Sequence, residues 1–321
     1  MESVTTTGPS ERAAQLATLF RAQQRRVWGL AYRLTASAED ADDIVQEAFA
    51  RLVAQPPESP IEDLGPWLRR VATNLGIDAL RRRRHRAYLG PWLPSPVETS
   101  QADWLDAQAS EQPDPEARYG LVESVTYAFL LALEALGPRQ RAVLLLRDVL
   151  GASARETADL IGASEGNVRV LHTRARHALE AYDQSRCIPT PELLARHRGV
   201  LDQLLGCLLA QDARGLEALL AESVHTVTDA AGEFTALAMP MAGRARVARF
   251  YLAAALQRRA PGTRIEVRLV NGLPAALITL ERPVRRQAPR TLLRCELDDT
   301  GRIRLVHAIL APRKLAALRP A

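Results

Sequence analysis

The chain has 321 residues, a formal net charge of +5 at pH 7 and 47% hydrophobic residues. This length exceeds one typical domain, and a surplus of arginine suits a negatively charged partner such as nucleic acid. The three cysteines, at 187, 207 and 295, form no Cys-x-x-Cys pair, which argues against a zinc site and a disulfide framework. No apolar run reaches membrane-spanning length. We therefore expect a cytoplasmic protein of several domains that holds no metal and no cofactor.

An amphipathic helix with an acidic face is predicted between Ala38 and Leu52. Its apolar residues, Ile44, Val45, Ala48, Phe49 and Leu52, recur at helical spacing. Its acids, at positions 40, 43 and 47, share another face, and those in the first turns suit the positive end of the helix dipole. A solvated acidic face is common in soluble proteins. Beside a basic helix, however, this face favours a basic protein surface as partner.

The most informative stretch, from Trp67 to Arg86, predicts a helix that is apolar on one side and suited to nucleic acid on the other. Leu68, Ala72, Leu75 and others form the buried stripe, whereas Arg70, Asn74, Asp78 and Arg81 recur on a different face. Asparagine can present a donor and an acceptor to a base edge, and the arginines from position 81 onward suit phosphates. An arginine run alone is as often a solvated surface or a targeting signal.

A helix-turn-helix is predicted between Gly137 and Tyr182. A helix begins at Gly137-Pro138 and runs to Leu150, a second runs from Ser153 to Ile161, and a third from Glu165 to about Tyr182. Ser153 with Glu156 forms a capping-box pattern, Gly162 makes the turn, and Ser164 caps the third helix. A generic helical hairpin could share this periodicity. The caps and the outward polar residues favour DNA binding, and these residues are Glu165, Asn167, Arg169, His172, Thr173 and Arg176.

These segments resemble regions 2 and 4 of bacterial sigma factors of the extracytoplasmic-function class. The resemblance rests on residues 40–49, 67–81 and 164–176. It implies a region 2 domain over 13–88 and a region 4 domain over 118–183, with core RNA polymerase (its beta-prime clamp and beta flap) and promoter DNA as partners. The core-binding residues implied are Asp40, Asp43, Gln46 and Glu47. The implied −10 contacts are Trp67, Arg70, Asn74, Asp78, Arg81 and Arg82, and the helix-turn-helix residues would read the −35 element.

The linker at 89–117 contains six acids, five prolines and no basic residue. We expect it to be extended, mobile and negative. It is either an ordinary acidic spacer or a segment that enters the basic nucleic-acid channel of the polymerase. Its first residues, 88–94, resemble a signature of a sigma subgroup that carries a third domain at the C terminus.

A third domain is predicted over 190–316. Helices are expected near 191–211, 216–221 and 243–258, followed by alternating strands with turns at 271–272 and 298–301. This order indicates an α+β cone with an antiparallel sheet, which resembles the SnoaL-like branch of the nuclear-transport-factor-2-like fold. The fold class is therefore two all-α domains plus an α+β cone.

The third domain offers candidate regulatory and catalytic residues. In the resembled subgroup this domain tunes sigma activity by docking in cis, which implies contacts from Asp229, Gly232, Arg313 and Lys314. The segment 229–233 has alanines where the subgroup has glycines, and 311–315 departs from the expected tail signature. His225, Asp229, Glu296 and His307 could line the cone, where a His/Asp pair could do acid–base work. We expect no enzyme activity. The alternative is a helix-turn-helix regulator with a ligand-binding or enzymatic SnoaL-like domain.

Overall fold

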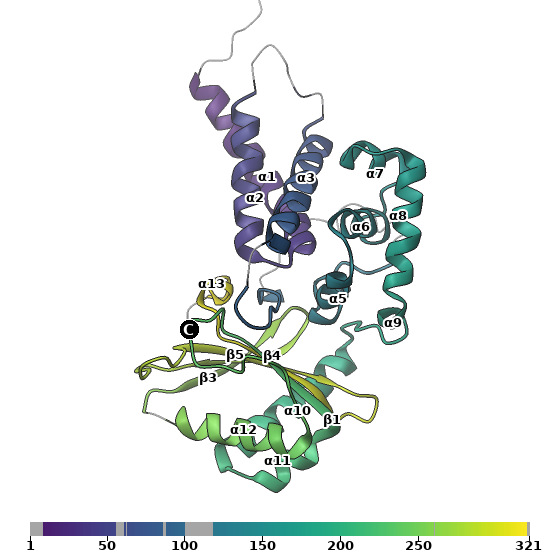
Figure 1. Cartoon of the computed structure of the whole chain (residues 1–321). Coiled ribbons are helices and arrows are strands. Elements are labelled where there is room, and N and C mark those ends of the chain that lie inside the picture. Colours follow the sequence, from purple (N-terminus) through teal and green to yellow (C-terminus); the bar gives the residue numbers. More distant parts are fainter. Residues whose placement is uncertain are drawn as a thin grey trace, which may run out of the picture. The chain divides into compact units, whose positions relative to one another are not determined.

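The computed structural model describes residues 9–55, 61, 63–85, 88–99, 118–259 and 261–319 (Figure 1). The chain forms two compact units, and each is assembled from three stretches. The first unit contains Met1–His85, Asp103–Leu121 and Ala132–Gln184. The second contains Arg86–Ala102, Val122–Leu131 and Ser185–Ala321. The units therefore interleave along the sequence instead of following one another.

The N-terminal part of the first unit is a bundle of three helices, α1 (Pro9–Thr35), α2 (Ala38–Val53) and α3 (Leu64–His85). Ser37 caps α2 by accepting a hydrogen bond from the backbone N–H of Asp40 at 3.1 Å. The apolar residues predicted for the inner face of α2 are all buried. The acidic positions of α2 are thereby left on its outer side.

The helix-turn-helix is confirmed in the same unit. It consists of α6 (Pro138–Leu144), η4 (Leu145–Val149), α7 (Ala154–Ile161) and α8 (Glu165–Ala178). The reciprocal Ser153–Glu156 cap is formed, and Gly162 adopts a left-handed conformation with φ of 62°. Two details differ from the prediction. The first helix ends in the π-helical turn η4, and the third ends at Ala178, followed by the short α9 (Glu180–Asp183).

The second unit is an α+β cone built on a six-stranded sheet with strand order β2-β1-β6-β5-β4-β3. The strands are β1 (Leu220–Asp229), β2 (Met241–Ala242), β3 (Arg264–Val270), β4 (Leu273–Thr279), β5 (Arg290–Leu297) and β6 (Ile303–Ile309). Three helices lie on one side of it, α10 (Pro191–Ala210), α11 (Ala213–Leu219) and α12 (Arg244–Gln257) (Figure 1). The sheet is mixed and not purely antiparallel, because β1 runs parallel to β6.

Strand β1 was missed by the sequence analysis, which placed a helix up to residue 221. Helix α11 ends at Leu219, and β1 begins at the next residue. The strand carries His225, Thr226, Thr228 and Asp229, so its buried positions include hydroxyls and a carboxylate. The apolar patterns that indicate β3 to β6 are therefore absent from β1.

The other face of the sheet is covered by three short pieces of chain. These are residues 88–99, the segment with η2 (Glu123–Val125) and α5 (Tyr127–Ala132), and α13 (Pro312–Leu315). Side chains from all three form one apolar cluster with the sheet, which includes Leu93, Tyr127, Leu277, Ile309 and Leu315. Alternate residues of each strand point to this cluster or to the one under the helices.

The prediction of a mobile linker is therefore wrong for the first part of the linker. Residues 93–98 are extended, as predicted, but they are buried. The physical reason is that this part is rich in apolar residues and prolines, whereas most of its acids come later. Residues 100–117, to which the rest of the prediction applies, lie outside the described part of the chain.

Candidate polymerase and nucleic-acid interfaces

The acidic face of α2 lies at the surface of the first unit. Asp43, Gln46 and Glu47 are exposed, whereas Asp40 is half-buried next to its cap. Glu47 forms an ion pair with Arg51 at 2.8 Å. Beside this face, α1 and α2 enclose a hollow lined by Phe20, Gln24, Arg25, Trp28, Asp42, Val45 and Gln46. An acidic rim next to aromatic side chains suits a partner surface with basic and apolar residues.

The polar face of α3 is exposed at Arg70, Asp78, Arg81 and Arg82 and half-buried at Trp67 and Asn74. Asp78 pairs with Arg81 at 2.9 Å. The amide of Asn74 is not open, because Nδ2 donates to the carbonyl oxygens of Arg70 at 2.9 Å and of Leu160 at 3.0 Å. A residue expected to contact the −10 element thus contacts α7 in this conformation.

Helix α8 presents its predicted residues in two different ways. Asn167, Arg169 and Thr173 are exposed and Glu165 is half-buried, with Arg169 and Glu165 paired at 2.8 Å. His172 and Arg176, expected to face outward, turn instead to the buried carboxylate of Asp148. Arg176 donates from Nε and Nη2 at 3.0 and 2.6 Å, and Nε2 of His172 lies 2.9 Å from Asp148 Oδ1.

Asp148 lies in the π-helical turn η4, which brings its carboxylate to the side of α8. Burial raises the pKa of Asp148, but the hydrogen bonds from His172 and Arg176 outweigh burial and leave the pKa lowered. A charged Asp148 therefore fixes α8 against the preceding helix. Asp148 was not among the residues predicted for the site, although an acid within an apolar helix face was a usable signal.

In the second unit, Asp229 and Lys314 hold the start of the linker. The carboxylate of Asp229 accepts hydrogen bonds from the Tyr88 hydroxyl at 2.6 Å and the Leu93 N–H at 2.8 Å. Lys314 donates from Nζ to Asp229 Oδ2 and to the carbonyl oxygen of Leu93, both at 2.5 Å. Its ammonium also lies over the rings of Tyr88 and Trp92, 4.7 and 4.5 Å from their centroids.

Asn271 holds the end of the same segment. Its Oδ1 accepts from the Val97 N–H at 2.9 Å, its own N–H donates to the Val97 carbonyl at 2.9 Å, and its Nδ2 donates to the Val125 carbonyl at 2.7 Å. Nearby, buried Glu98 pairs with Arg268 at 2.6 Å. From the sequence, Asn271 was predicted only as a turn residue. We call Asp229, Lys314 and Asn271 the linker anchor.

The other two predicted regulatory residues lie close to this anchor. Gly232 has φ of 77°, and a Cβ added there would lie 2.9 Å from Leu89 Cδ1. A side chain at position 232 would therefore push against the linker. Arg313 is exposed on α13.

The four candidate acid–base residues do not converge. His225 is exposed, and Asp229 belongs to the linker anchor. Glu296 and His307 are buried around Arg294, which donates to both and lies over the ring of Tyr127. Burial, aided by Arg294, lowers the pKa of His307 to about 3. These groups form a structural ionic cluster on the linker side of the sheet, so the four candidates do not form the His/Asp pair that acid–base work would use.

Similarity to known proteins agrees with this architecture. The Sigma-70 region 2 family matches residues 19–86, and the Sigma-70 region 4 family matches residues 127–179. The chain is 35% identical over 260 residues to the ECF RNA polymerase sigma factor SigJ of Mycobacterium tuberculosis, covering 79% of this chain and 78% of SigJ. The chain belongs to the extracytoplasmic-function sigma factors. It is thus an alternative sigma factor that directs RNA polymerase to promoters.

Other relatives of this sigma factor extend the similarity to nearly its whole length. The probable ECF RNA polymerase sigma factor SigI of Mycobacterium tuberculosis is 29% identical and covers 94% of both chains. The crystal structure of Mycobacterium tuberculosis SigJ superposes with a TM-score of 0.68 at 28% identity, covering 94% of this chain and 98% of that one. The fold of two helical sigma domains plus a SnoaL-like cone is therefore confirmed.

The described residues were also compared with the requirements of a metal site and of a membrane-spanning helix. Among them, no group of three or more His, Cys, Asp or Glu side chains is arranged to hold a metal ion. None of the described helices is both long and apolar enough to cross a membrane.

Proposed function

We propose that this sigma factor binds the polymerase clamp through α2, opens the −10 element with α3 and reads the −35 element with α8. We further propose that its SnoaL-like cone tunes these steps in cis, beside the polymerase in the cytoplasm. The observation that carries the regulatory part is the burial of residues 93–98 on the cone and their fixation by the linker anchor.

The linker anchor supports control because the linker joins the two promoter-reading regions. While Asp229 and Asn271 hold residues 88–97, this part of the linker cannot extend. The distance that the linker can span between α3 and region 4 is therefore reduced. A holoenzyme needs both regions at their promoter elements simultaneously, so the span of the linker affects assembly. The alternative function, a plain helix-turn-helix regulator, would not require the exposed acidic face of α2.

The test of regulation uses Asn271→Gly. Asn271 has φ of 50°, a conformation that glycine adopts easily, so the turn is retained while the bonds to Val97 N–H and Val125 C=O are lost. Run-off transcription with core polymerase on genomic fragments, at matched protein levels, should change relative to the wild type. A matched control is Arg286→Gly, an exposed residue of the cone with φ of 63° that lies outside the linker anchor. Equal output from wild type and Asn271→Gly, with the linker shown to be released by hydrogen exchange, would remove the regulatory role.

The polymerase contact has its own test. Reversing Asp43 and Glu47 to arginine should weaken holoenzyme assembly and leave the thermal transition nearly unchanged, since surface changes alter stability by about 0.5 kcal/mol or less. The control reverses two exposed acids of the cone, Asp202 and Asp299, to arginine. Assembly that is unaffected by the α2 reversal, in size-exclusion chromatography with core polymerase, would contradict the assignment.

Promoter opening can be separated from duplex binding. Asn74→Ala and Asp78→Ala should reduce permanganate reactivity at the −10 element while a gel shift of the duplex is partly retained. The reason is that these side chains precede the arginines suited to phosphates. Equal loss in both assays would contradict a role specific to opening.

A further inference from the structure

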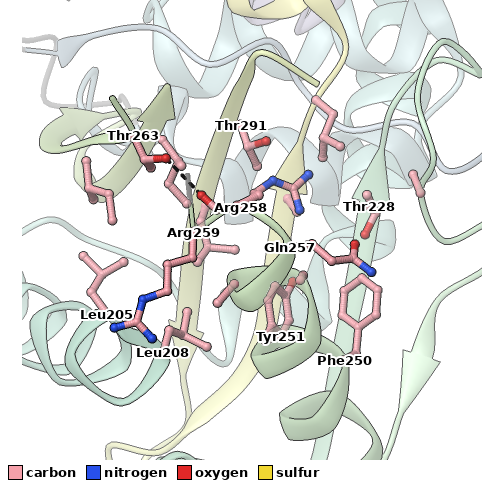
Figure 2. A pocket seen from close by; sticks show the side chains of 18 of the residues that line it. Leu205, Leu208, Thr228, Phe250, Tyr251, Gln257, Arg258, Arg259, Thr263 and Thr291 are labelled. Carbon is pink, nitrogen blue, oxygen red and sulfur yellow. Dashed lines mark hydrogen bonds between the residues drawn. The ribbon is translucent and has the colours of Figure 1, made fainter. Parts of the chain in front are cut away.

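The cone contains a cavity of about 430 Å³ between the sheet and helices α10 and α12. Its walls are mostly apolar and include Leu205, Leu208, Phe250 and Leu293, with Tyr251 and Ala254 from α12 (Figure 2). The volume lies in the range of sites that enclose small organic molecules. The four acid–base candidates are not among the residues that line it.

Three polar groups in the wall lack a partner. Thr228 on β1 and Thr291 on β5 are only 4% and 6% exposed, and their hydroxyl oxygens make no hydrogen bond with any described residue. The Nε of Arg258, at the C-terminal end of α12, is also buried and unpaired among the described residues. Buried polar groups in native proteins are almost always hydrogen-bonded, so three in one cavity indicate a missing partner.

The charged residues in the cavity wall indicate the chemical class of the missing partner. Arg258 and Arg259 both line the cavity, and no carboxylate is among the lining residues. Figure 2 shows Arg258 extending inward among the labelled side chains, whereas Arg259 extends toward Leu205 and Leu208. Arg258 is half-buried, no acid is among the described residues that line the cavity with it, and burial lowers its pKa. An arginine in such a place favours an anion with two coplanar oxygens.

We propose that the cavity binds a small apolar monocarboxylate, with its carboxylate on Arg258 and the hydroxyls of Thr228 and Thr291, and its apolar body among Leu205, Leu208 and Phe250. The Thr263 hydroxyl supports this placement by donating to the Arg258 carbonyl at 2.9 Å, which fixes the end of α12 (Figure 2). The lining contains no His, Asp, Glu, Cys or Lys, so the site is built for binding and not for proton transfer.

The site also adjoins the linker anchor. Thr228 and Asp229 are consecutive residues of β1, and their side chains point to opposite faces of the sheet, one to the cavity and one to the linker. A ligand in the cavity would therefore contact the strand that carries the anchor. Binding itself does not depend on the proposed regulation, and it is measured without polymerase.

The test is calorimetric titration of the full chain with decanoate and with 2-naphthoate, compared with decanol and decylamine. At least one of the acids should bind with one site per chain, and the uncharged and cationic analogues should bind about tenfold more weakly or worse. Arg258→Gln should weaken acid binding about tenfold or more, and the isosteric Thr228→Val about threefold. Arg249→Gln, an exposed arginine of the same helix outside the cavity, is the matched control and should bind as the wild type does.

Three results would overturn the proposal. They are no binding of either acid by the wild type, binding of decanol or decylamine as tight as that of decanoate, and unchanged acid binding by Arg258→Gln that shows the wild-type circular dichroism. Thr228→Val and Thr291→Val keep the side-chain volume, so together they decide the outcome if Arg258→Gln does not fold. Unchanged acid binding by both threonine variants would then also overturn it.

Discussion

The carboxylate of Asp229 lies 2.5 Å from the ammonium of Lys314, 85 residues later in the chain, and both side chains are buried. Lys314 is the one lysine of the sequence. Between them the two residues bind Tyr88 and Leu93, so a single ion pair joins the first strand of the cone, its last helix and the linker. Breaking the pair should therefore affect both the cone and the linker.

We expect Asp229→Asn to lower the free energy of unfolding by about 3 kcal/mol, because it leaves the ammonium of Lys314 buried without its counter-charge. Adding Lys314→Met to this variant should recover part of the loss. Urea unfolding followed by circular dichroism measures both, and hydrogen exchange should report faster exchange at the Leu93 N–H in each. A loss below about 1 kcal/mol for the single variant would show that the pair is not effectively desolvated.

The lowered pKa of Asp148 predicts that the stability of the helix-turn-helix decreases in acid. Its pKa in the folded chain is below the unfolded value of about 3.9, so its stabilising effect is complete above that pH and is lost as pH falls through the folded pKa. The stability difference between wild type and Asp148→Asn should be largest near pH 7 and should shrink below about pH 4. Asp159→Asn, an exposed acid on α7, is the control. A difference that is independent of pH would contradict the role of the charge.

Arg169 and Arg176 should behave differently although both lie on α8. Arg169→Ala should weaken −35 duplex binding in a gel shift by about 1–3 kcal/mol, if it makes a bidentate base contact, with little change in melting temperature. Arg176→Ala should lower the melting temperature, because it removes two hydrogen bonds to Asp148. If Arg176→Ala melts like the wild type and still loses DNA binding, Arg176 contacts DNA directly.

Ala231 is a site where a substitution should stabilise the cone. It has φ of 49°, a left-handed conformation that an alanine adopts only at a cost. We expect Ala231→Gly to raise the free energy of unfolding by about 0.5–1 kcal/mol. The neighbouring Ala230 is buried and has no positive φ, so Ala230→Gly should destabilise instead. Thermal unfolding of the two variants in parallel checks the prediction, and a loss in both would contradict the strain at position 231.

The helical half of the fold was predictable because its signals are local. Ser153, Glu156 and Gly162 set the helix ends of the helix-turn-helix through contacts within a few residues, and the structure confirms each of them. The apolar stripe of α2 likewise needs only helical periodicity. Strand β3 alternates clearly between apolar and charged residues, whereas β4 to β6 are recognisable as short apolar runs between turn residues.

The remaining features depend on residues distant in sequence. Asn271 binds Val97 and Val125, which lie 174 and 146 residues earlier in the chain. No local sequence pattern encodes contacts over such separations. The inward turn of Arg176 depends on a π-helical turn that places Asp148 beneath it. The cavity wall includes Thr228 on β1 and Thr291 on β5, which no local sequence pattern marks as part of one site. In each case tertiary contacts override the local preference.

The interleaving of the two units has a consequence for synthesis on the ribosome. Leu93 and Tyr127 pack against Ile309, Leu315 and Leu318, which are translated long after them. The helices of the first unit can pack as soon as residue 184 has emerged, since none of its stretches lies beyond that point. The apolar side chains at 93 and 127 lack these partners until residues 309–318 have emerged, a period in which incompletely covered apolar surface favours aggregation or chaperone binding. A chain that stops before β6 therefore leaves part of this surface without its cover.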